Sequence, residues 1–208
     1  MAKLNHTHIH FILDRSGSMG AMKVQAIEGY NEFITGQADA PGTADLTFVQ
    51  FDHEYQTVLE NTDIKLVKKL DDQTYVPRGT TALLDAIGIS IDRLGEDLAA
   101  KSENERPELV MMVILTDGME NSSSSYNLDD IKNRIEHQQS HYNWQFEFLS
   151  SDLNSIKLAR NISIPMDNIV KFENSEKGMK SAFHNMNETI FFRRGSLDTT
   201  QEALKNSK

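Results

Sequence analysis

The sequence predicts a single α/β domain in which helices cover both faces of a doubly wound, mostly parallel sheet. Short apolar runs alternate along the chain with segments whose apolar residues recur at helical spacing, the pattern of such a fold. The run at residues 109–115 is apolar throughout, which is typical of a central strand covered on both faces. With 208 residues, the chain has the length of one domain.

The N-terminal part of the chain predicts three strands and one helix. The first strand covers residues 9–13 and ends at Asp14. A turn rich in Gly and Ser follows, and then a helix at 21–37 whose apolar residues lie three and four apart. Strands at 46–51 and 55–60 are joined by so short a turn that they can form only an antiparallel hairpin.

The middle of the chain predicts one short and one long helix. Residues 63–70 form the short helix, which leads into a loop at 71–79. In the long helix, apolar residues step by three and four from Leu84 to Leu98, and a polar stretch at 101–107 ends it. The apolar run described above follows directly and forms the fourth strand.

The C-terminal part of the chain predicts two further strands and three helices. The strands lie at 144–149 and 169–172, and the helices at 127–141, 152–161 and 175–192. Asn127 and Asp152 are suitable N-caps, because their side-chain oxygens can accept backbone N–H groups. Gly195 is expected to end the last helix, so the domain should span residues 1–195 and the polar residues 196–208 should form a mobile tail.

Together these elements predict a six-stranded sheet in the order 3-2-1-4-5-6, with strand 3 antiparallel at one edge. In doubly wound sheets, ligands bind at the carboxyl ends of the strands where the winding reverses, here between strands 1 and 4. Asp14 ends the first of these strands and Asp117 follows the second. Both carboxylates should therefore face one crevice.

Three segments bring oxygen atoms to that crevice. Asp14, Ser16 and Ser18 present a carboxylate and two hydroxyls from one tight, Gly-containing loop. Thr81 presents a hydroxyl just before the long helix, and Asp117 a second carboxylate after the central strand. Hard oxygen ligands without His or Cys suit Mg²⁺, Mn²⁺ or Ca²⁺, not zinc. Only two of these side chains are charged, and Mg²⁺ tends to retain water, so that carboxylate contacts can be water-mediated. A dication held in this way would keep residual positive charge and an exchangeable position, and could accept a carboxylate from a partner.

Two alternatives stay open at this point. Ser16 and Ser18 could merely cap the following helix, with the acids solvated, and Thr80 could take the place of Thr81 as the ligand. Arg15 lies between the candidate ligands and is expected to point away from a cation, because like charges repel.

The three segments contain the motifs Asp-x-Ser-x-Ser at residues 14–18, Gly-x-Thr at 79–81 and Thr-Asp-Gly at 116–118. In this order and at these places, they resemble a von Willebrand factor A domain with an intact metal-ion-dependent adhesion site. The resemblance covers roughly residues 7–192. It implies that the site binds Mg²⁺ or Mn²⁺ and engages an acidic residue of a protein partner, and its Gly-x-Thr-x-Leu spacing favours Thr81 over Thr80. The ligands it implies are Asp14, Ser16, Ser18, Thr81 and Asp117. The short chain without cysteine is more similar to the intracellular bacterial and phage members than to secreted adhesins.

Composition limits the remaining function classes. The chain has no cysteine, which excludes disulfides, thiolate-held metals and cysteine nucleophiles. A formal charge of −10 disfavours binding to a phosphate backbone, so no nucleic-acid partner is expected. No secretory signal and no apolar run of about 20 residues is evident, so we expect a cytoplasmic protein without membrane contact.

The leading functional hypothesis is a non-catalytic, metal-dependent protein-binding module. A metal-dependent phosphohydrolase could use the same crevice, but no second Asp follows Asp14 at short spacing and no general base is evident. A scaffold or accessory subunit of an ATPase or stress-response complex is the other alternative. The chain has no phosphate-binding Gly-x-x-x-x-Gly-Lys-Ser/Thr motif, so such an ATPase would be a separate polypeptide.

A few side chains outside the motifs carry weaker signals. His6, His8 and His10 should share one face of an extended strand, and their exposed position favours solvated histidines over an accessory metal site. Met19 is expected in the core or as an apolar contact beside the metal. Glu120 and Asn121 are expected to be plain loop residues, and the alternative is that they support the metal ligands or contact a partner.

Overall fold

The computed structural model describes the backbone of residues 2–206 and the side chains of residues 2–196. Six strands form one sheet in the order β3-β2-β1-β4-β5-β6. The pairing is parallel throughout, except that β3 runs antiparallel to β2. The strands are β1 (Lys3–Asp14), β2 (Thr43–Phe51), β3 (Tyr55–Asp63), β4 (Pro107–Thr116), β5 (Gln145–Ser150) and β6 (Ile169–Lys171). The predicted fold class and strand order are confirmed.

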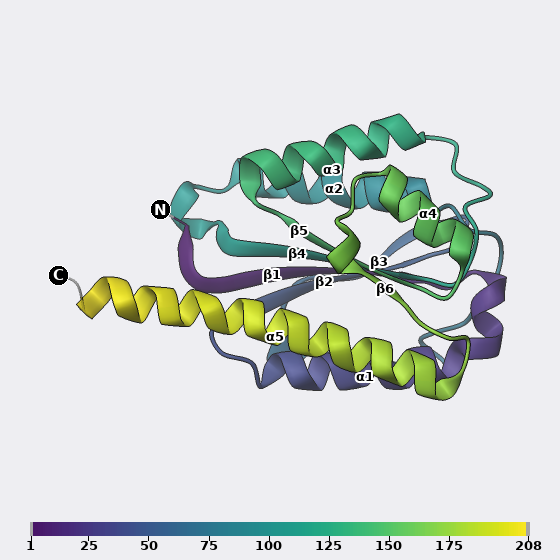
Figure 1. Ribbon diagram of the computed structural model, residues 1–208, viewed down its shortest axis with the longest axis horizontal. Coiled ribbons are helices and arrows are strands. Elements are labelled where there is room, and N and C mark those ends of the chain that lie inside the picture. The colour runs from purple at the N-terminus through teal and green to yellow at the C-terminus, as the bar shows by residue number, and fades with distance from the viewer. Residues whose placement is uncertain (1, 207–208) are drawn as a thin grey trace.

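Helices cover both faces of the sheet, as Figure 1 shows. One face carries α1 (Lys23–Ala38) and α5 (Glu176–Asn206), and the other carries α2 (Leu83–Ala100), α3 (Leu128–Tyr142) and α4 (Leu153–Asn161). Four 3-10 turns complete the chain: η1 (Gly17–Met22), η2 (Ile64–Leu66), η3 (Glu103–Glu105) and η4 (Met166–Asn168). Because β1 lies in the middle of the sheet, its side chains alternate between two separate cores. Phe11 packs toward α1 and α5, and Ile12 toward α2.

The prediction of a helix at residues 63–70 is wrong beyond the first turn. Only η2 is helical there, and the chain then runs extended toward Leu70. The side chain of Asn31 on α1 provides the backbone of Leu70 with the hydrogen bonds that a helix would otherwise supply. Asn31 Oδ1 accepts the N–H of Leu70 at 2.8 Å, and Asn31 Nδ2 donates to the carbonyl of Leu70 at 2.9 Å. A contact from another element therefore satisfies this backbone.

The prediction that Gly195 ends the last helix is also wrong. Helix α5 continues through Gly195 to Asn206, and residues 207–208 lie outside the described residues. The domain boundary at residue 195 stays a prediction. The buried guanidinium of Arg194 donates to the backbone carbonyl of Gln37 at 2.6 Å and to its Oε1 at 3.0 Å. A glycine inside a helix costs only about 1 kcal/mol, and anchoring contacts of this kind offset it.

The three alternating histidines of β1 are buried, which contradicts the expected exposure. His6 Nε2 lies 2.8 Å from Asp45 Oδ2, and His8 Nδ1 is hydrogen-bonded to Asp45 Oδ1. Both ring nitrogens of His10 lack a hydrogen-bond partner among the described residues. Burial, followed by the charge of nearby His8, lowers the pKa of His10 to about 3. Within the described residues, these side chains do not form a group of three ligand atoms close enough to share a metal ion.

Buried His10 should make the stability of the domain depend on pH. The unfolded chain takes up a proton near pH 6.5, whereas folded His10 stays neutral down to about pH 3. The free energy of unfolding should therefore fall as the pH drops below 6.5, by up to about 1.4 kcal/mol per pH unit from this one group. Urea unfolding of wild type and His10→Leu at pH 5, 6 and 7 tests this. Wild type should lose more stability toward pH 5 than the variant, and equal losses would contradict the assignment.

Candidate metal centre

Asp14 lies at the carboxyl end of β1 with its carboxylate fully buried. Asp14 Oδ1 accepts the backbone N–H of Ser16 at 2.6 Å, and Oδ2 accepts the hydroxyl of Thr116 at 2.6 Å. Thr116 is the last residue of β4, the neighbouring parallel strand. The two strand ends that the topology brings together therefore fix the position of this carboxylate.

Three hydroxyls converge on one small volume beside Asp14. Gly118 shows this most directly: a Cβ at that residue would lie 2.8 Å from Thr81 Oγ1, 3.0 Å from Ser18 Oγ and 3.3 Å from Ser16 Oγ. The hydroxyls of Ser16 and Ser18 are themselves 3.0 Å apart. Glycine at residue 118 thus leaves open a cradle lined by three hydroxyl oxygens, two from the loop after β1 and one from the loop before α2.

Asp117 completes the acidic side of this cradle. Its Oδ1 accepts the hydroxyl of Ser18 at 2.8 Å. Burial raises the pKa of Asp14 to about 6, against hydrogen bonds from Thr116 and Ser16, and the neighbouring Asp117 raises it further. Burial also raises the pKa of Asp117, with a smaller contribution from Asp152. Partly desolvated carboxylates that repel one another favour a bound cation, and oxygen ligands alone fit a hard one such as Mg²⁺.

The loop that carries Thr81 is attached directly to the loop of Asp14. The hydroxyl of fully buried Tyr75 donates to the backbone carbonyl of Asp14 at 2.5 Å. The backbone N–H of Gly17 donates to the carbonyl of Gly79 at 3.1 Å. These contacts hold the loop before α2 against the end of β1. The position of the Thr81 hydroxyl beside Ser16 and Ser18 therefore depends on residues far away in sequence.

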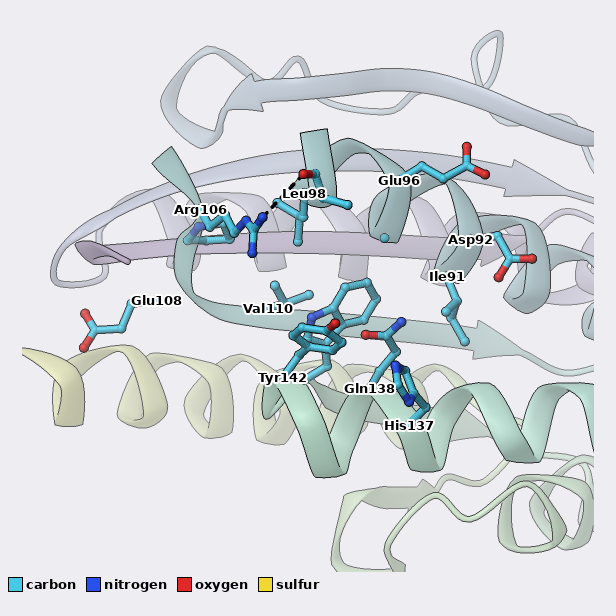
Figure 2. Close-up of a pocket in the computed structure, with 14 residues that line it drawn as sticks. Ile91, Asp92, Glu96, Leu98, Arg106, Glu108, Val110, His137, Gln138 and Tyr142 are labelled. Atoms are coloured by element: carbon cyan, nitrogen blue, oxygen red, sulfur yellow. Dashed lines mark hydrogen bonds between the residues drawn. The ribbon is translucent and has the colours of Figure 1, made fainter. Parts of the chain in front are cut away.

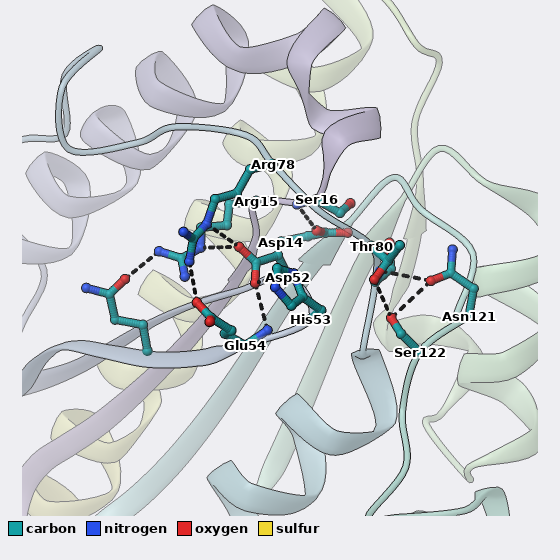
Figure 3. Close-up of polar contacts among 12 residues, drawn as sticks. Asp14, Arg15, Ser16, Asp52, His53, Glu54, Arg78, Thr80, Asn121 and Ser122 are labelled. Atoms are coloured by element: carbon teal, nitrogen blue, oxygen red, sulfur yellow. Dashed lines mark hydrogen bonds and ion pairs between the residues drawn. The ribbon is translucent and has the colours of Figure 1, made fainter.

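An ion-pair network beside the cradle, drawn in Figure 3, strengthens this attachment. Fully buried Asp52 accepts the Nε of Arg15 at 2.9 Å and the Nε of Arg78 at 2.8 Å through the same Oδ2. Burial opposes ionisation, but the N–H of Glu54 and the two guanidiniums hold the pKa of Asp52 below its usual range. As expected, Arg15 points away from Asp14.

Asp52, His53 and Glu54 also bring ligand atoms within 4.8 Å of one another, which is a second grouping that a metal ion could use. Arg15 and Arg78 already occupy Asp52, and Arg78 pairs with Glu54 as well. Two guanidiniums at this position would repel a cation. This repulsion favours the oxygen cradle around Gly118 as the candidate cation site.

The loop after Asp117 supports the cradle from behind. Asn121 Oδ1 accepts the N–H of Thr81 at 2.9 Å, and the carbonyl of Thr81 accepts the N–H of Asn121 at 3.0 Å. Glu120 Oε2 accepts the N–H of Leu84 in the first turn of α2 at 2.9 Å. The hydroxyl of exposed Thr80 instead accepts that of Ser122 at 2.9 Å, outside the cradle. Thr81, and not Thr80, thus joins Ser16 and Ser18.

Sequence reasoning missed Tyr75, which shapes the site, and it assigned no role to Thr116 and Gly118 although both flank Asp117 in the Thr-Asp-Gly segment. That segment was the local signal for Thr116 and Gly118. Tyr75 had none, since its role depends on the docking of another segment. Met19 is fully buried and belongs to the core, whereas Met119 is the exposed methionine in this region.

Thr116→Val should weaken cation binding by about tenfold, because groups that orient a metal ligand typically contribute that much. The valine keeps the shape of the side chain but removes the hydrogen bond to Asp14 Oδ2. Titration of the cation, followed by thermal unfolding, measures the change. Thr47→Val, also in a buried part of the sheet but with its hydroxyl bonded to the N–H of Asn61, is the matched control. Equal affinity in both variants would argue against Thr116 as an orienting residue.

The fold and this crevice together define a class: doubly wound α/β domains with an oxygen-lined cation crevice at the carboxyl edge of the sheet. The family model for the von Willebrand factor type A domain matches residues 8–191. The chain belongs to this family. A comparison with curated protein sequences finds no significant match.

Solved structures share this fold at low sequence identity. The von Willebrand factor domain of the type V pili tip protein Mfa5 from Porphyromonas gingivalis aligns with TM-score 0.60 and 12% identity, over 88% of this chain and 94% of that one. Manganese-loaded TRAP protein from Plasmodium vivax aligns with TM-score 0.58 and 14% identity, over 86% and 72%.

Proximal thread matrix protein 1 from the mussel byssus, with zinc in its MIDAS (metal-ion-dependent adhesion site) motif, aligns with TM-score 0.56 and 13% identity. That alignment covers 90% of this chain but only 46% of the mussel protein, so this chain spans about half of its length. Among the described residues, no helix has the length and apolar character needed to cross a membrane.

Proposed function

We propose that the domain is a non-catalytic, cation-dependent protein-binding module. Its ligands would be Asp14, Ser16, Ser18, Thr81 and Asp117, with Mg²⁺ or Mn²⁺ as the bound ion and Ca²⁺ as a third candidate. The observation that carries the proposal is the convergence of three hydroxyls on Gly118 between two carboxylates. The metal-loaded relatives described above support a divalent cation in this crevice.

The composition of the ligand set leaves room for an acidic partner. Five side chains would fill five of the six positions of an octahedral cation, and a carboxylate that acts through a bound water would leave the dication with net positive charge. When bound, the cation would supply a Lewis-acidic position open to a further oxygen ligand. Thr116 would keep Asp14 oriented, and Asn121 would keep Thr81 in place. An aspartate or glutamate of a protein partner would then complete the coordination.

Apolar side chains beside the crevice favour a protein as the source of that carboxylate. Met119 and Leu153 are 53% and 56% exposed. Met119 follows Asp117 and Gly118 directly, and its sulfur accepts the amide of Asn154 at 3.1 Å, which brings the start of α4 next to the crevice. Aliphatic groups of this kind could pack against side chains that flank the acidic residue of a partner.

Thermal unfolding with EDTA, Mg²⁺, Mn²⁺ or Ca²⁺ tests the cation part of the proposal. A cation present at 100 times its dissociation constant stabilises by about 2.7 kcal/mol, which raises the melting temperature of a 200-residue chain by roughly 5–10 °C. We expect such a rise with Mg²⁺ or Mn²⁺ on wild type. No rise with any of the three cations would contradict a metal site that is formed in the isolated chain.

Affinity capture with and without EDTA tests the partner part. A partner that is recovered with Mg²⁺, lost with EDTA and lost again when its own acidic residue is replaced by the amide supports the proposal. Recovery of the same partner after chelation would indicate a scaffold instead. Hydrolysis of p-nitrophenyl phosphate that requires both the cation and Asp14 would indicate that the domain is a phosphohydrolase and not a binding module.

A further inference from the structure

The turn that joins β2 to β3 contacts the chain on both sides of Thr81. Before Thr81, the Nε of Arg78 donates to Asp52 Oδ2 at 2.8 Å, and the same guanidinium pairs with Glu54. After Thr81, the backbone N–H of Ala82 donates to the carbonyl of Asp52 at 2.8 Å. The segment that carries the Thr81 hydroxyl is therefore held by the same turn at both of its ends.

The same turn also holds the loop after β1. Asp52 Oδ2 accepts the Nε of Arg15 at 2.9 Å, so one buried oxygen atom joins Arg15 to Arg78. Backbone contacts follow the same path. The N–H of Arg15 donates to the carbonyl of Phe51 at 2.7 Å, and the carbonyl of Arg15 accepts the N–H of Arg78 at 2.7 Å. Because Arg15 directly precedes Ser16, the turn is linked to two of the loops that carry candidate ligands.

The loop before α2 passes very close to this turn at Gly79. A Cβ at Gly79 would lie 2.3 Å from Nδ1 of His53, so a side chain there would have to displace the imidazole. The φ of Gly79 is +67°, in the left-handed region that favours glycine. The carbonyl of Gly79 accepts the N–H of Gly17 at 3.1 Å. The path of the chain toward Thr81 is thus fitted between the turn and the loop after β1.

The two arginines that share Asp52 differ in exposure. A fully buried carboxylate such as that of Asp52 is stable only when hydrogen-bond donors and opposite charges surround it. Its Oδ1 accepts the N–H of Glu54 at 2.7 Å, and its Oδ2 has both guanidiniums. Arg15 is buried, whereas the side chain of Arg78 is 51% exposed. Replacing Arg78 therefore breaks the link to the loop before α2 but leaves Asp52 paired with Arg15.

We propose that Arg78, acting through Asp52, is a positioning residue for Thr81, and that this ion pair sets the cation affinity of the crevice. The inference rests on the proposed function, because it takes Thr81 as a ligand. The guanidinium of Arg78 points to the turn and away from Ser16, as Figure 3 shows, so it acts only by fixing where the Thr81 hydroxyl lies. Without the pair, the loop before α2 should open more often, and the hydroxyls should converge less often.

Arg78→Gln tests this inference by calorimetric titration with Mn²⁺. The affinity should fall by about tenfold, the usual effect of removing a group that orients a metal ligand. Arg78→Lys keeps the charge but lacks the fork that reaches Asp52 and Glu54 together, so it should bind more tightly than Arg78→Gln. An Arg78→Gln protein that binds Mn²⁺ like wild type would overturn the inference and leave the proposed function standing. No binding by wild type would overturn both.

Amide hydrogen exchange in EDTA separates a positioning role from a general loss of stability. The N–H of Ala82 should exchange faster in Arg78→Gln than in wild type, and the N–H groups in the middle of β4 should not. Arg106→Gln is the matched control. Arg106 donates to the carbonyls of Lys101 at 3.1 Å and Ala99 at 3.4 Å, close to the start of β4 and far from the crevice beyond its end, as Figure 2 shows for the end of α2.

The control variant should leave both the exchange of the Ala82 N–H and the Mn²⁺ affinity as in wild type. Slow exchange at Ala82 in Arg78→Gln would show that Arg78 does not hold the loop, and would overturn the inference without reference to any cation. Equal losses of Mn²⁺ affinity in Arg78→Gln and Arg106→Gln would also overturn it, because the effect would then not depend on the contact with Asp52.

Discussion

Asp14→Asn should abolish stabilisation by divalent cations while leaving the metal-free domain at least as stable as wild type. Asparagine keeps the size of the side chain and can still accept the N–H of Ser16, but it removes the buried charge. The pKa of Asp14 is raised to about 6, so its ionisation opposes folding above that pH. Removing the charge should therefore stabilise the metal-free protein at pH 7.5, by on the order of 1 kcal/mol.

The measurement is the melting temperature at pH 7.5 with EDTA and with saturating Mg²⁺ or Mn²⁺. The melting temperature of wild type should rise by roughly 5–10 °C with the cation, and that of Asp14→Asn should not rise at all. Asp97→Asn is the matched control, because Asp97 lies near the end of α2, pairs with Lys101 and is remote from the crevice. An Asp14→Asn protein that keeps the full cation-dependent rise would exclude Asp14 as a ligand.

Gly118→Ala should eliminate cation binding through a single added methyl group. The alanine Cβ would lie 2.8–3.3 Å from the hydroxyls of Thr81, Ser18 and Ser16, where no Cβ fits without displacing them. The backbone of Gly118 is not in the left-handed region, so alanine is compatible with its conformation. The added methyl group should therefore displace the hydroxyls and leave the backbone in place. We expect the affinity for Mg²⁺ or Mn²⁺ to fall by more than about 100-fold, or about 2.7 kcal/mol.

Gly20→Ala is the control for this substitution. Gly20 belongs to η1, just after the loop that carries Ser16 and Ser18, but a Cβ there would meet no atom within 4 Å. It should bind the cation like wild type. Isothermal titration calorimetry with Mn²⁺ on both variants compares them directly. Tight binding by Gly118→Ala would mean that the cation lies elsewhere, and the group around Asp52 would then be the next site to test.

The parts of the fold that were predicted correctly rest on short-range patterns. The apolar run of β4 marked a strand covered on both faces, and the short hairpin turn required β2 and β3 to be antiparallel. Asn127 and Asp152 cap their helices as expected, since each accepts a backbone N–H three residues ahead. Such interactions lie within one turn of the chain, so the residue types alone are sufficient evidence for them.

The errors share one physical cause, which is a contact between segments distant in sequence. Residues 67–70 are not helical because Asn31 satisfies the backbone of Leu70. Helix α5 passes through Gly195 next to an arginine that binds the end of α1. His6 and His8 of β1 are buried beside Asp45 of the neighbouring strand, which offers both of them a partner, whereas His10 is buried without one. No local pattern contains this information.

The sequence by itself determined the doubly wound fold, the strand order, and which residues reach the crevice between β1 and β4. It did so because periodicity and motif position decide on which element, and at which end, each candidate ligand lies. Only the tertiary structure decided how the candidate ligands meet. Thr81 rather than Thr80 faces the cradle, and Gly118 leaves the space between the hydroxyls open. Contacts from Thr116 and Tyr75 fix the position of Asp14. Those outcomes depend on how the loops after β1, before α2 and after β4 dock against one another, and contacts between segments distant in sequence fix that docking.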